Sequence, residues 1–569
     1  MLSCGIHINE GSTRSQHFTL SVLRAVYKRP ESLTSTKYIA NMSVTVETAT
    51  VESPASSIST FMVLLVSAVA LFFAYWKISR RRFLQLAEKI PGPKGYPIIG
   101  NALDFLGSSS QVTDRMIQIG FQFTTVAKVW ILHKLVVFIA DPRDIEKSEE
   151  YRFFKPWLGD GLLISSGQKW KSHRKLIAPT FHLNVLKSFV DLFNANSRAV
   201  CDKMAKENGR TFDCHDYMSE CTVEVLLETA MGVSKKTQNK SGFEYAMAVM
   251  KMCNILHLRH SKVWLRPDWL FNLTKYGKEQ VDLLDVIKNK KEIISSGTKK
   301  YIEESVTQEE KAIASTPVKG LRDDLDEQDE NDVGQKKRLA FLDLMIESAQ
   351  NGVVLTDEEI KEEVDTIMFE GHDTTAAGSS FFLCLMGIHQ KYQDMCVQEL
   401  NQIFGDSDRP ATFADTLEMK FLERCLLEAL RMYPPVPVIA RKLAEDLTLA
   451  STGVVIPQGT TIVVSTVKTH RLEEHWPNPD VYDPDNHLPE KAAERHYYSF
   501  IPFSAGPRSC VGRKYALLKL KIILSTILRN FKVHSDISED EFKLQGDIIL
   551  KRADGFMIRL EPRKKTVAA

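Results

Sequence analysis

The sequence predicts a mainly helical protein with small β-sheets (α+β), preceded by one transmembrane helix. After residue 91, long stretches repeat their apolar residues with helical spacing, whereas strand-like runs are short and few. Near the amino terminus, the stretch Ile58–Trp76 contains no charged residue. The composition, 44% hydrophobic and 25% charged over 569 residues, is typical of a folded protein and excludes disordered and collagen-like chains.

The overall charge and the cysteines narrow the choice of partners and compartment. Lysines and arginines number 73 against 72 acidic residues, so the net charge of +1 provides no basic field for nucleic acid, and none is expected as a partner. The nine cysteines are scattered and form no CxxC pair. We therefore expect free thiols in a reducing compartment and not a disulfide framework or a zinc finger.

The amino-terminal region has the pattern of a single-pass membrane anchor. As a helix, residues 58–76 would span about 28 Å, close to the hydrocarbon thickness of about 30 Å. A basic, Pro/Gly-rich linker follows at 77–97, so the positive-inside rule places residues 1–57 in the lumen and the rest in the cytosol. A cleaved signal peptide and a buried core helix are the alternatives. The basic cluster on the carboxyl side and the breaker Pro91–Pro97 argue against them.

The clearest helix in the catalytic part runs from Asp357 to His389, with Thr356 as its N-cap. Its apolar pattern is interrupted at the centre by the polar segment Glu370–Thr375. Polar groups in a buried helix are costly, and such violations of local rules are expected where function lies.

The predicted strands are short, and one segment stands apart. Strand-like runs occur at Val126–Ile139, Leu443–Leu449, Thr461–Thr466, Ile548–Leu550 and Phe556–Leu560. An insert at about 306–335 is strongly acidic, with Asp323–Asp332 as its densest part, and is predicted to be an exposed connection. Residues 98–569 are otherwise expected to form one catalytic domain.

The segment Phe503–Gly512 holds one cysteine, Cys510, directly before a predicted amphipathic helix. A helix amino terminus stabilises a thiolate, glycines allow close approach of a flat ligand, and Arg508 can pair with a carboxylate. A buried free cysteine in a turn is the alternative. The spacing F-x-x-G-x-R-x-C-x-G resembles the haem-binding loop of the cytochrome P-450 superfamily. This resemblance implies the cytochrome P-450 fold, haem b as cofactor, Cys510 as the axial iron ligand and Phe503 in the haem-binding loop.

Further motifs follow in the order of that superfamily, over residues 88 to 562. Glu428 and Arg431 resemble its structural E-x-x-R ion pair, and Trp170, Arg174 and Arg441 resemble its propionate-binding residues. Asn486 and His487 depart from the usual Glu-Arg-Phe stretch, so an arginine from that segment is not expected beside Glu428. By resemblance, Thr374 and Asp373 are the catalytic residues that deliver protons during oxygen activation.

The segment Phe369–Thr375 resembles family 4 of the superfamily, the fatty-acid ω-hydroxylase branch, in which the residue equivalent to Glu370 can form an ester to the haem. Three stretches resemble the insect G subfamily, whose members are associated with oxidative decarbonylation of long-chain aldehydes to cuticular hydrocarbons: Asp329–Gly334, Arg495–Phe503 and Asp547–Lys551. We therefore expect a membrane-bound monooxygenase acting on long-chain aldehydes. Fatty-acid ω-hydroxylation is the alternative. A haem sensor without turnover is the alternative of another class, and a sensor would not need the pair Asp373 and Thr374.

The resemblance also implies partners: dioxygen, a lipid substrate, NADPH-cytochrome reductase and the endoplasmic reticulum membrane. A basic face for the reductase is expected from Arg513, Lys514, Lys519 and Lys521, with Lys169 and Lys171. The aromatic stretch Val263–Phe271 suits either a membrane interface or ordinary core packing.

Overall fold

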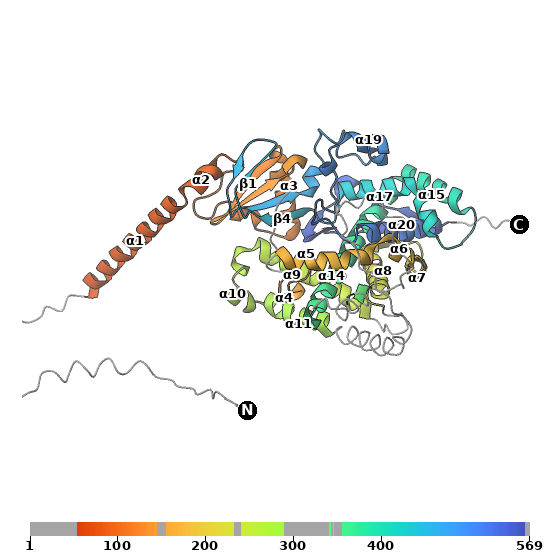
Figure 1. Ribbon diagram of the computed structural model, residues 1–569, viewed down its shortest axis with the longest axis horizontal. Coiled ribbons are helices and arrows are strands. Elements are labelled where there is room, and N and C mark those ends of the chain that lie inside the picture. The colour runs from red at the N-terminus through yellow and green to blue at the C-terminus, as the bar shows by residue number, and fades with distance from the viewer. Residues whose placement is uncertain are drawn as a thin grey trace, which may run out of the picture. The chain divides into compact units, whose positions relative to one another are not determined.

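The computed structural model describes residues 54–144, 155–232, 241–289, 341–342, 345 and 355–563. The chain divides into two units, Met1–Ile78 and Ser79–Ala569. Most of the predicted luminal tail and the acidic insert at 306–335 lie outside the described residues. The second unit is mainly helical with small sheets, as the sequence predicts (Figure 1).

The first unit contains helix α1, Pro54–Ser79. Its segment Ser59–Ser79 has a mean hydropathy of 2.1, and none of it is buried within the protein. Leu64, Leu71 and Phe72 expose more than half of their surface. A single apolar helix of this length is consistent with the predicted membrane anchor at 58–76.

The second unit begins earlier than the predicted boundary at residue 98. Helix α2, Arg81–Glu88, lies within the expected linker at 77–97. Ala87 and Ile90 are almost fully buried in a core formed with residues of the first sheet, such as Val137 and Ile462. The amphipathic pattern of α2 explains this, because its apolar side packs on the sheet while its arginines remain exposed.

The largest sheet has four strands in the order β1-β2-β7-β4. These are β1 Val126–Ile131, β2 Lys134–Ile139, β7 Thr461–Ser465 and β4 Val438–Lys442. The predicted run Val126–Ile139 is an antiparallel hairpin in which Ile131 faces Lys134, and β2 continues parallel to β7. Helix α3, Ser109–Gln122, lies beside this sheet at one end of the domain (Figure 1).

Three smaller sheets complete the strands. They comprise β3 Thr211–Asp213, β11 Met557–Pro562 and β8 Phe531–His534; β9 Leu544–Asp547 with β10 Ile549–Arg552; and β5 Leu447–Thr448 with β6 Val455–Ile456. The predicted strand Leu443–Leu449 is thus reduced to two residues. The β9–β10 pair is a tight antiparallel hairpin whose tip, Ile548, has a φ of +73°.

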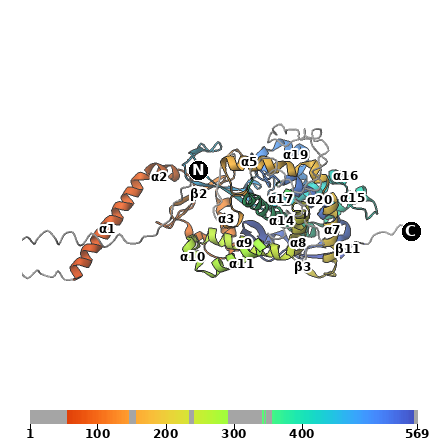
Figure 2. The same ribbon diagram turned by 60° about the horizontal axis from the view of Figure 1, so that its bottom comes forward.

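The helices form one large core around α14, Asp357–Ile388 (Figure 2). The remaining helices are α4 Lys155–Leu158, α5 Gly167–Ile177, α6 Leu183–Lys187, α7 Val190–Ala205, α8 Cys214–Thr229, α9 Ser241–Ser261, α10 Asp268–Asn272, α11 Lys275–Asn289, α15 Gln390–Phe404, α16 Phe413–Glu418, α17 Lys420–Met432, α18 Thr466–Thr469, α19 Pro489–Glu494 and α20 Arg513–Asn530. Residues Phe381–Met386 of α14 have no exposed surface. This burial accounts for the apolar residues from which the helix was predicted.

Deleting residues 1–78 should release the second unit from membranes without unfolding it. The reason is that the core residues of this unit belong to the chain after residue 79. We expect the truncated chain to lose resistance to alkaline carbonate extraction while its thermal unfolding midpoint, measured by circular dichroism, stays that of the full chain. A lowered midpoint, or carbonate resistance that survives the deletion, would contradict this.

Candidate functional site

The loop Phe503–Gly512 is folded tightly around its cysteine. The Cys510 N–H donates a hydrogen bond to the carbonyl oxygen of Phe503 at 2.8 Å, and the Ser509 N–H donates to that of Gly506 at 2.9 Å. Gly506 has a φ of +72°, which glycine adopts without strain. Gly512 is the N-cap of α20, and its N–H is directed at the Cys510 sulfur. The sulfur therefore lies at the amino end of a helix.

The surroundings of Cys510 favour the thiol unless a cation is present. Burial raises the pKa of the Cys510 thiol to about 11, and the charge of Glu370 acts in the same direction. The residue nevertheless has accessible surface. A sulfur that protein atoms surround but do not cover is suited to meet a metal ion, which stabilises the thiolate outright.

Helix α14 carries the polar segment Glu370–Thr375 at its centre and remains continuous there. It starts at the predicted N-cap Thr356, which forms a capping box with Glu359. The polar segment at 370–375 interrupts the apolar pattern, as predicted, but not the helix. Its side chains bond back to the backbone: the Thr374 hydroxyl donates to the Glu370 carbonyl oxygen at 2.6 Å, and Thr375 to that of Gly371 at 2.9 Å. The helix therefore carries functional groups at its centre and keeps its backbone hydrogen bonds.

One face of α14 is accessible at this point. Glu370 and Thr374, four residues apart, keep accessible surface, whereas the neighbouring Asp373 is fully buried. Burial raises the pKa of Glu370 to about 7, with Glu363 contributing and Arg174 opposing. Because the charge of Glu370 also acts on Cys510, α14, α5 and the cysteine loop face one another.

Aromatic and guanidinium groups gather beside the cysteine. Trp170 and Arg174 lie one turn apart on α5, and the Arg508 guanidinium stacks over the Trp170 ring at 4.1 Å. The Arg174 Nη1 donates to the Ser509 carbonyl oxygen at 2.7 Å, which ties α5 to the loop. Arg441 lies on the edge strand β4 and is partly exposed, with its Nη1 3.4 Å from the Ala440 carbonyl oxygen. These groups fit a flat, iron-containing cofactor that bears carboxylates. The thiol can hold the iron, the accessible face of α14 can lie against the cofactor, and the arginines can pair with its carboxylates.

Two residues that the sequence did not single out hold α5 against α14. The His173 Nδ1 lies 2.7 Å from the Glu363 carboxylate, and the Leu162 N–H donates to the other oxygen of Glu363 at 3.0 Å. Both side chains are nearly or fully buried. Glu363 and Glu370 are seven residues apart on one helix face, and two buried acids at that spacing were the signal that could have revealed Glu363.

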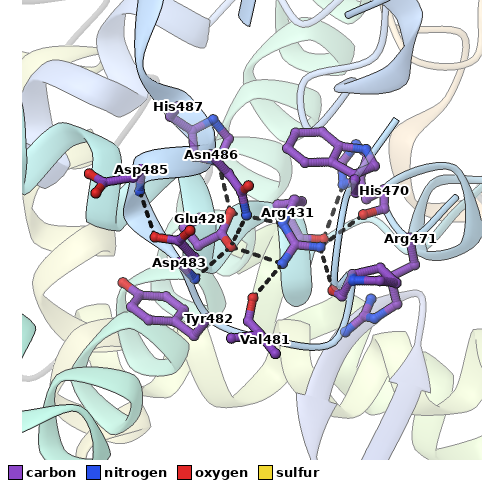
Figure 3. A network of polar contacts seen from close by, with 12 residues as sticks. Glu428, Arg431, His470, Arg471, Val481, Tyr482, Asp483, Asp485, Asn486 and His487 are labelled. Atoms are coloured by element: carbon purple, nitrogen blue, oxygen red, sulfur yellow. Dashed lines mark hydrogen bonds and ion pairs between the residues drawn. The ribbon is translucent and has the colours of Figure 1, made fainter. Parts of the chain in front are cut away.

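A buried ion pair between Glu428 and Arg431 lies at the centre of a polar network (Figure 3). The Arg431 guanidinium donates two hydrogen bonds to the Glu428 carboxylate, both at 2.8 Å, and neither side chain is exposed. The remaining donors of Arg431 reach the carbonyl oxygens of His470, Pro479 and Val481 at 3.0, 2.6 and 3.1 Å. The pair therefore fixes two segments of the loop that leads to residue 483.

Asn486 and His487, which depart from the Glu-Arg-Phe stretch named above, complete this network. The Asn486 Nδ2 donates to one oxygen of Glu428 and the His487 Nε2 contacts the other, each at 3.0 Å. The Asp483 N–H adds a bond at 2.9 Å. Burial alone would raise the pKa of Glu428, but His487 and Arg431 lower it to about 2. The departure from the family pattern thus preserves a fully satisfied carboxylate.

The expected basic face is smaller than predicted. Lys519 is fully buried, and its Nζ donates to the Gly371 carbonyl oxygen at 3.0 Å and to the Thr375 hydroxyl at 3.1 Å. Lys521 is nearly buried and binds the Thr416 carbonyl oxygen at 2.9 Å. Both project into the protein because α20 packs between α7, α15 and α14. Arg513 and Lys171 are exposed, and Lys514 and Lys169 are partly exposed.

An apolar pocket lies where α3, the four-stranded sheet and the β9–β10 hairpin meet. It is lined mainly by apolar side chains, among them Met116, Phe121, Phe138, Val438, Leu544 and Leu550. Val438 follows the Pro434–Pro437 turn, and the Leu550 N–H donates to the Pro435 carbonyl oxygen at 2.8 Å. The pocket is therefore joined to the turn that precedes Arg441.

Comparison with known proteins identifies the class. The cytochrome P450 family model matches residues 90–560. The chain is 59% identical to cytochrome P450 4g15 of Drosophila melanogaster over 560 residues, which covers 89% of this chain and 97% of that protein. It is 48% identical to cytochrome P450 4g1 of the same organism over 564 residues (93% and 100%), and 34% identical to human cytochrome P450 4V2 over 497 residues (85% and 91%).

The chain belongs to the cytochrome P450 family, whose members are haem-thiolate monooxygenases. Within it, the similarities place the chain in family 4, as a monooxygenase of the G subfamily. Activation of dioxygen with electrons from a reductase follows from this membership.

Replacing His487 by phenylalanine should destabilise the protein by about 1.5–3 kcal/mol, the usual contribution of a hydrogen bond to a charged group. The ring would keep its packing near Phe500, whose centroid lies 4.8 Å away, while Glu428 loses one partner. Urea unfolding followed by tryptophan fluorescence measures the change. Glu490→Gln, at an exposed position on α19, is the control, and equal stability of the two variants would contradict the prediction.

The same variant should also change the pH dependence of stability. Burial lowers the pKa of His487, so the folded protein keeps this ring neutral, with Nε2–H donated to Glu428. Below about pH 6.5 the unfolded chain takes up a proton there that the folded chain does not. Stability is therefore lost as the pH falls, and His487→Phe should lose less free energy of unfolding between pH 7 and pH 5 than the parent.

Proposed function

We propose that this protein removes the aldehyde carbon of long-chain aldehydes by oxidative decarbonylation, as a single-pass protein of the endoplasmic reticulum membrane. The observation that carries the lipid part is the apolar pocket between α3, the four-stranded sheet and the hairpin. An alkyl chain gains about 0.8 kcal/mol for each methylene group that it buries in such a lining. The aldehyde part rests on the resemblance of three stretches to the G subfamily.

The residues of the site have distinct proposed roles in holding the haem. Cys510, in the loop that starts at Phe503, would hold the haem iron, and Arg508, Arg174 and Arg441 would pair with the haem carboxylates, with Trp170 packed under Arg508. When bound, the haem supplies the iron at which dioxygen is activated. Glu428 and Arg431 act at a distance, by fixing the chain behind the loop.

Thr374 and Asp373 are the proposed proton-delivering residues. Thr374 keeps accessible surface on the same helix face as Glu370. Its hydroxyl donates to the Glu370 carbonyl oxygen and would have to turn from that bond to donate a proton toward the reacting centre. Asp373, at the preceding position, is buried and charged: burial would raise its pKa, but the charge of Lys551 lowers it. A charged carboxylate beside a hydroxyl provides an acceptor and a donor in series.

Exposed apolar residues support approach of the substrate from the membrane. Trp264 and Trp269 expose 50% and 70% of their surface, and Leu273 exposes 74%. Phe271, between Trp269 and Leu273 in the sequence, is buried in the core, so only part of the stretch Val263–Phe271 is available for a membrane interface. Tryptophans in this setting favour the lipid headgroup region. For the reductase, the basic face now proposed consists of Arg513, Lys514, Lys169 and Lys171.

Glu370 is proposed to form an ester to the haem. Its side chain is accessible on the α14 face that meets the cysteine loop, and its pKa near 7 keeps much of it uncharged. After denaturation and extraction with acidic organic solvent, we expect haem to stay with the parent polypeptide and to be released from Glu370→Gln, which cannot form the ester. Complete release of unmodified haem from the parent would overturn the assignment.

The product identifies the reaction. Purified full-length protein with NADPH-cytochrome reductase, NADPH and a saturated long-chain aldehyde should yield the alkane one carbon shorter, detected by gas chromatography. Thr374→Ala is expected to consume NADPH and release peroxide with little alkane. A terminal alcohol or acid from a fatty-acid substrate, with no alkane from the aldehyde, would replace decarbonylation by ω-hydroxylation.

A further inference from the structure

The carboxyl-terminal hairpin carries a lysine into the centre of α14. Lys551 lies on β10, and its Nζ is 2.7 Å from Oδ1 of Asp373. The Asp373 side chain has no exposed surface, whereas that of Lys551 is 15% exposed. The two residues are far apart in the sequence, so the hairpin has to be in place for this contact to form. The lysine therefore joins the buried carboxylate to the protein surface.

The other groups that face Asp373 do not supply this charge. They are His372 on the same helix, His215 on α8 and the Cys253 thiol on α9. Burial lowers the pKa of His215 to about 3 and also lowers that of His372, so both rings are neutral at pH 7. Burial alone would raise the pKa of Asp373, but the charge of Lys551 lowers it.

The contact between Lys551 and Asp373 lies next to Thr374, the other proposed proton-delivering residue. Asp373 directly precedes Thr374, and the second Asp373 oxygen, Oδ2, makes no hydrogen bond within the described part of the chain. One oxygen is thus held by Lys551 while the other is available for a proton. The β10 strand is itself fixed, because Leu550, next to Lys551, is bonded to the Pro435 carbonyl oxygen at 2.8 Å.

We propose that Lys551 is the positioning residue that holds Asp373 charged and conducts protons to it from solvent. The Lys551 ammonium group gives a proton to the Asp373 carboxylate, Asp373 passes that proton toward Thr374 and is charged again, and the Lys551 amine takes a proton from solvent. Two such cycles deliver the two protons that reduction of one oxygen atom to water requires. This inference rests on the proposed roles of Asp373 and Thr374, and it does not depend on which lipid is oxidised.

The test compares full-length variants with reductase and NADPH. Lys551→Met removes the charge and keeps the chain length, Lys551→Arg restores a cation, and Lys543→Met replaces an exposed lysine next to the same hairpin. We expect Lys551→Met to lose about tenfold or more in product formation, in line with the usual size of acid–base contributions. It should release more peroxide per NADPH and show a larger solvent deuterium isotope effect. Lys551→Arg should recover most of the coupling, and Lys543→Met should match the parent.

A double-variant cycle separates proton delivery from folding. Lys551→Met alone leaves a buried carboxylate without its partner, whereas Asp373→Asn with Lys551→Met removes both charges. If Lys551 acts through Asp373, adding Lys551→Met to Asp373→Asn should change coupling and isotope effect little further. The reduced carbon monoxide difference spectrum verifies thiolate-bound haem in each variant. Parent-like coupling and isotope effect in Lys551→Met would overturn the proposal, whereas failure of the aldehyde assay alone would contradict only the substrate.

Discussion

The structure depends on one constraint: a long helix, α14, crosses the core and buries polar groups there. An unsatisfied buried polar group costs several kcal/mol, so most of these groups have a partner from another element or from the helix itself. Glu363 is met by His173 of α5, Asp373 by Lys551 of β10, and the Gly371 carbonyl by Lys519 of α20. The same contacts that make the polar centre tolerable therefore tie three distant elements to it.

The same requirement applies to a second group of buried polar residues, around Glu428 and Arg431. Glu428 and Arg431 are fully buried, and a buried ion pair is stable only when its remaining lone pairs and protons are also used. Carbonyl oxygens take the spare protons of Arg431, and Asn486 and His487 take the spare lone pairs of Glu428. The substitution at these two positions is tolerated because the requirement is on hydrogen bonds to the carboxylate and not on the identity of one side chain.

The sequence predicted what local chemistry decides. The N-cap at Thr356, the span of α14 and the position of Cys510 before α20 all follow from patterns within a few turns of chain. Long-range pairing was not predictable in the same way, because His173 and Glu363 are 190 residues apart and nothing local marks them as partners. The prediction that Lys519 belongs to an exposed basic face was wrong for a related reason. A lysine in an amphipathic pattern is expected at the surface, yet α20 is buried on nearly all sides.

The two carboxylic acids at the centre of α14 differ in charge for a reason that lies outside the helix. Glu370 keeps some accessible surface and Asp373 keeps none, and burial raises the pKa of both. For Glu370 the neighbouring Glu363 adds to this effect, and its pKa of about 7 leaves it largely neutral in weak acid. For Asp373, the charge of the Lys551 ammonium group outweighs burial and lowers the pKa. Titratable groups whose pKa values are driven apart take different roles in catalysis. On this argument the accessible face of α14 presents an uncharged acid, which apolar surroundings tolerate, and keeps the charged carboxylate behind it, in contact with a partly exposed lysine.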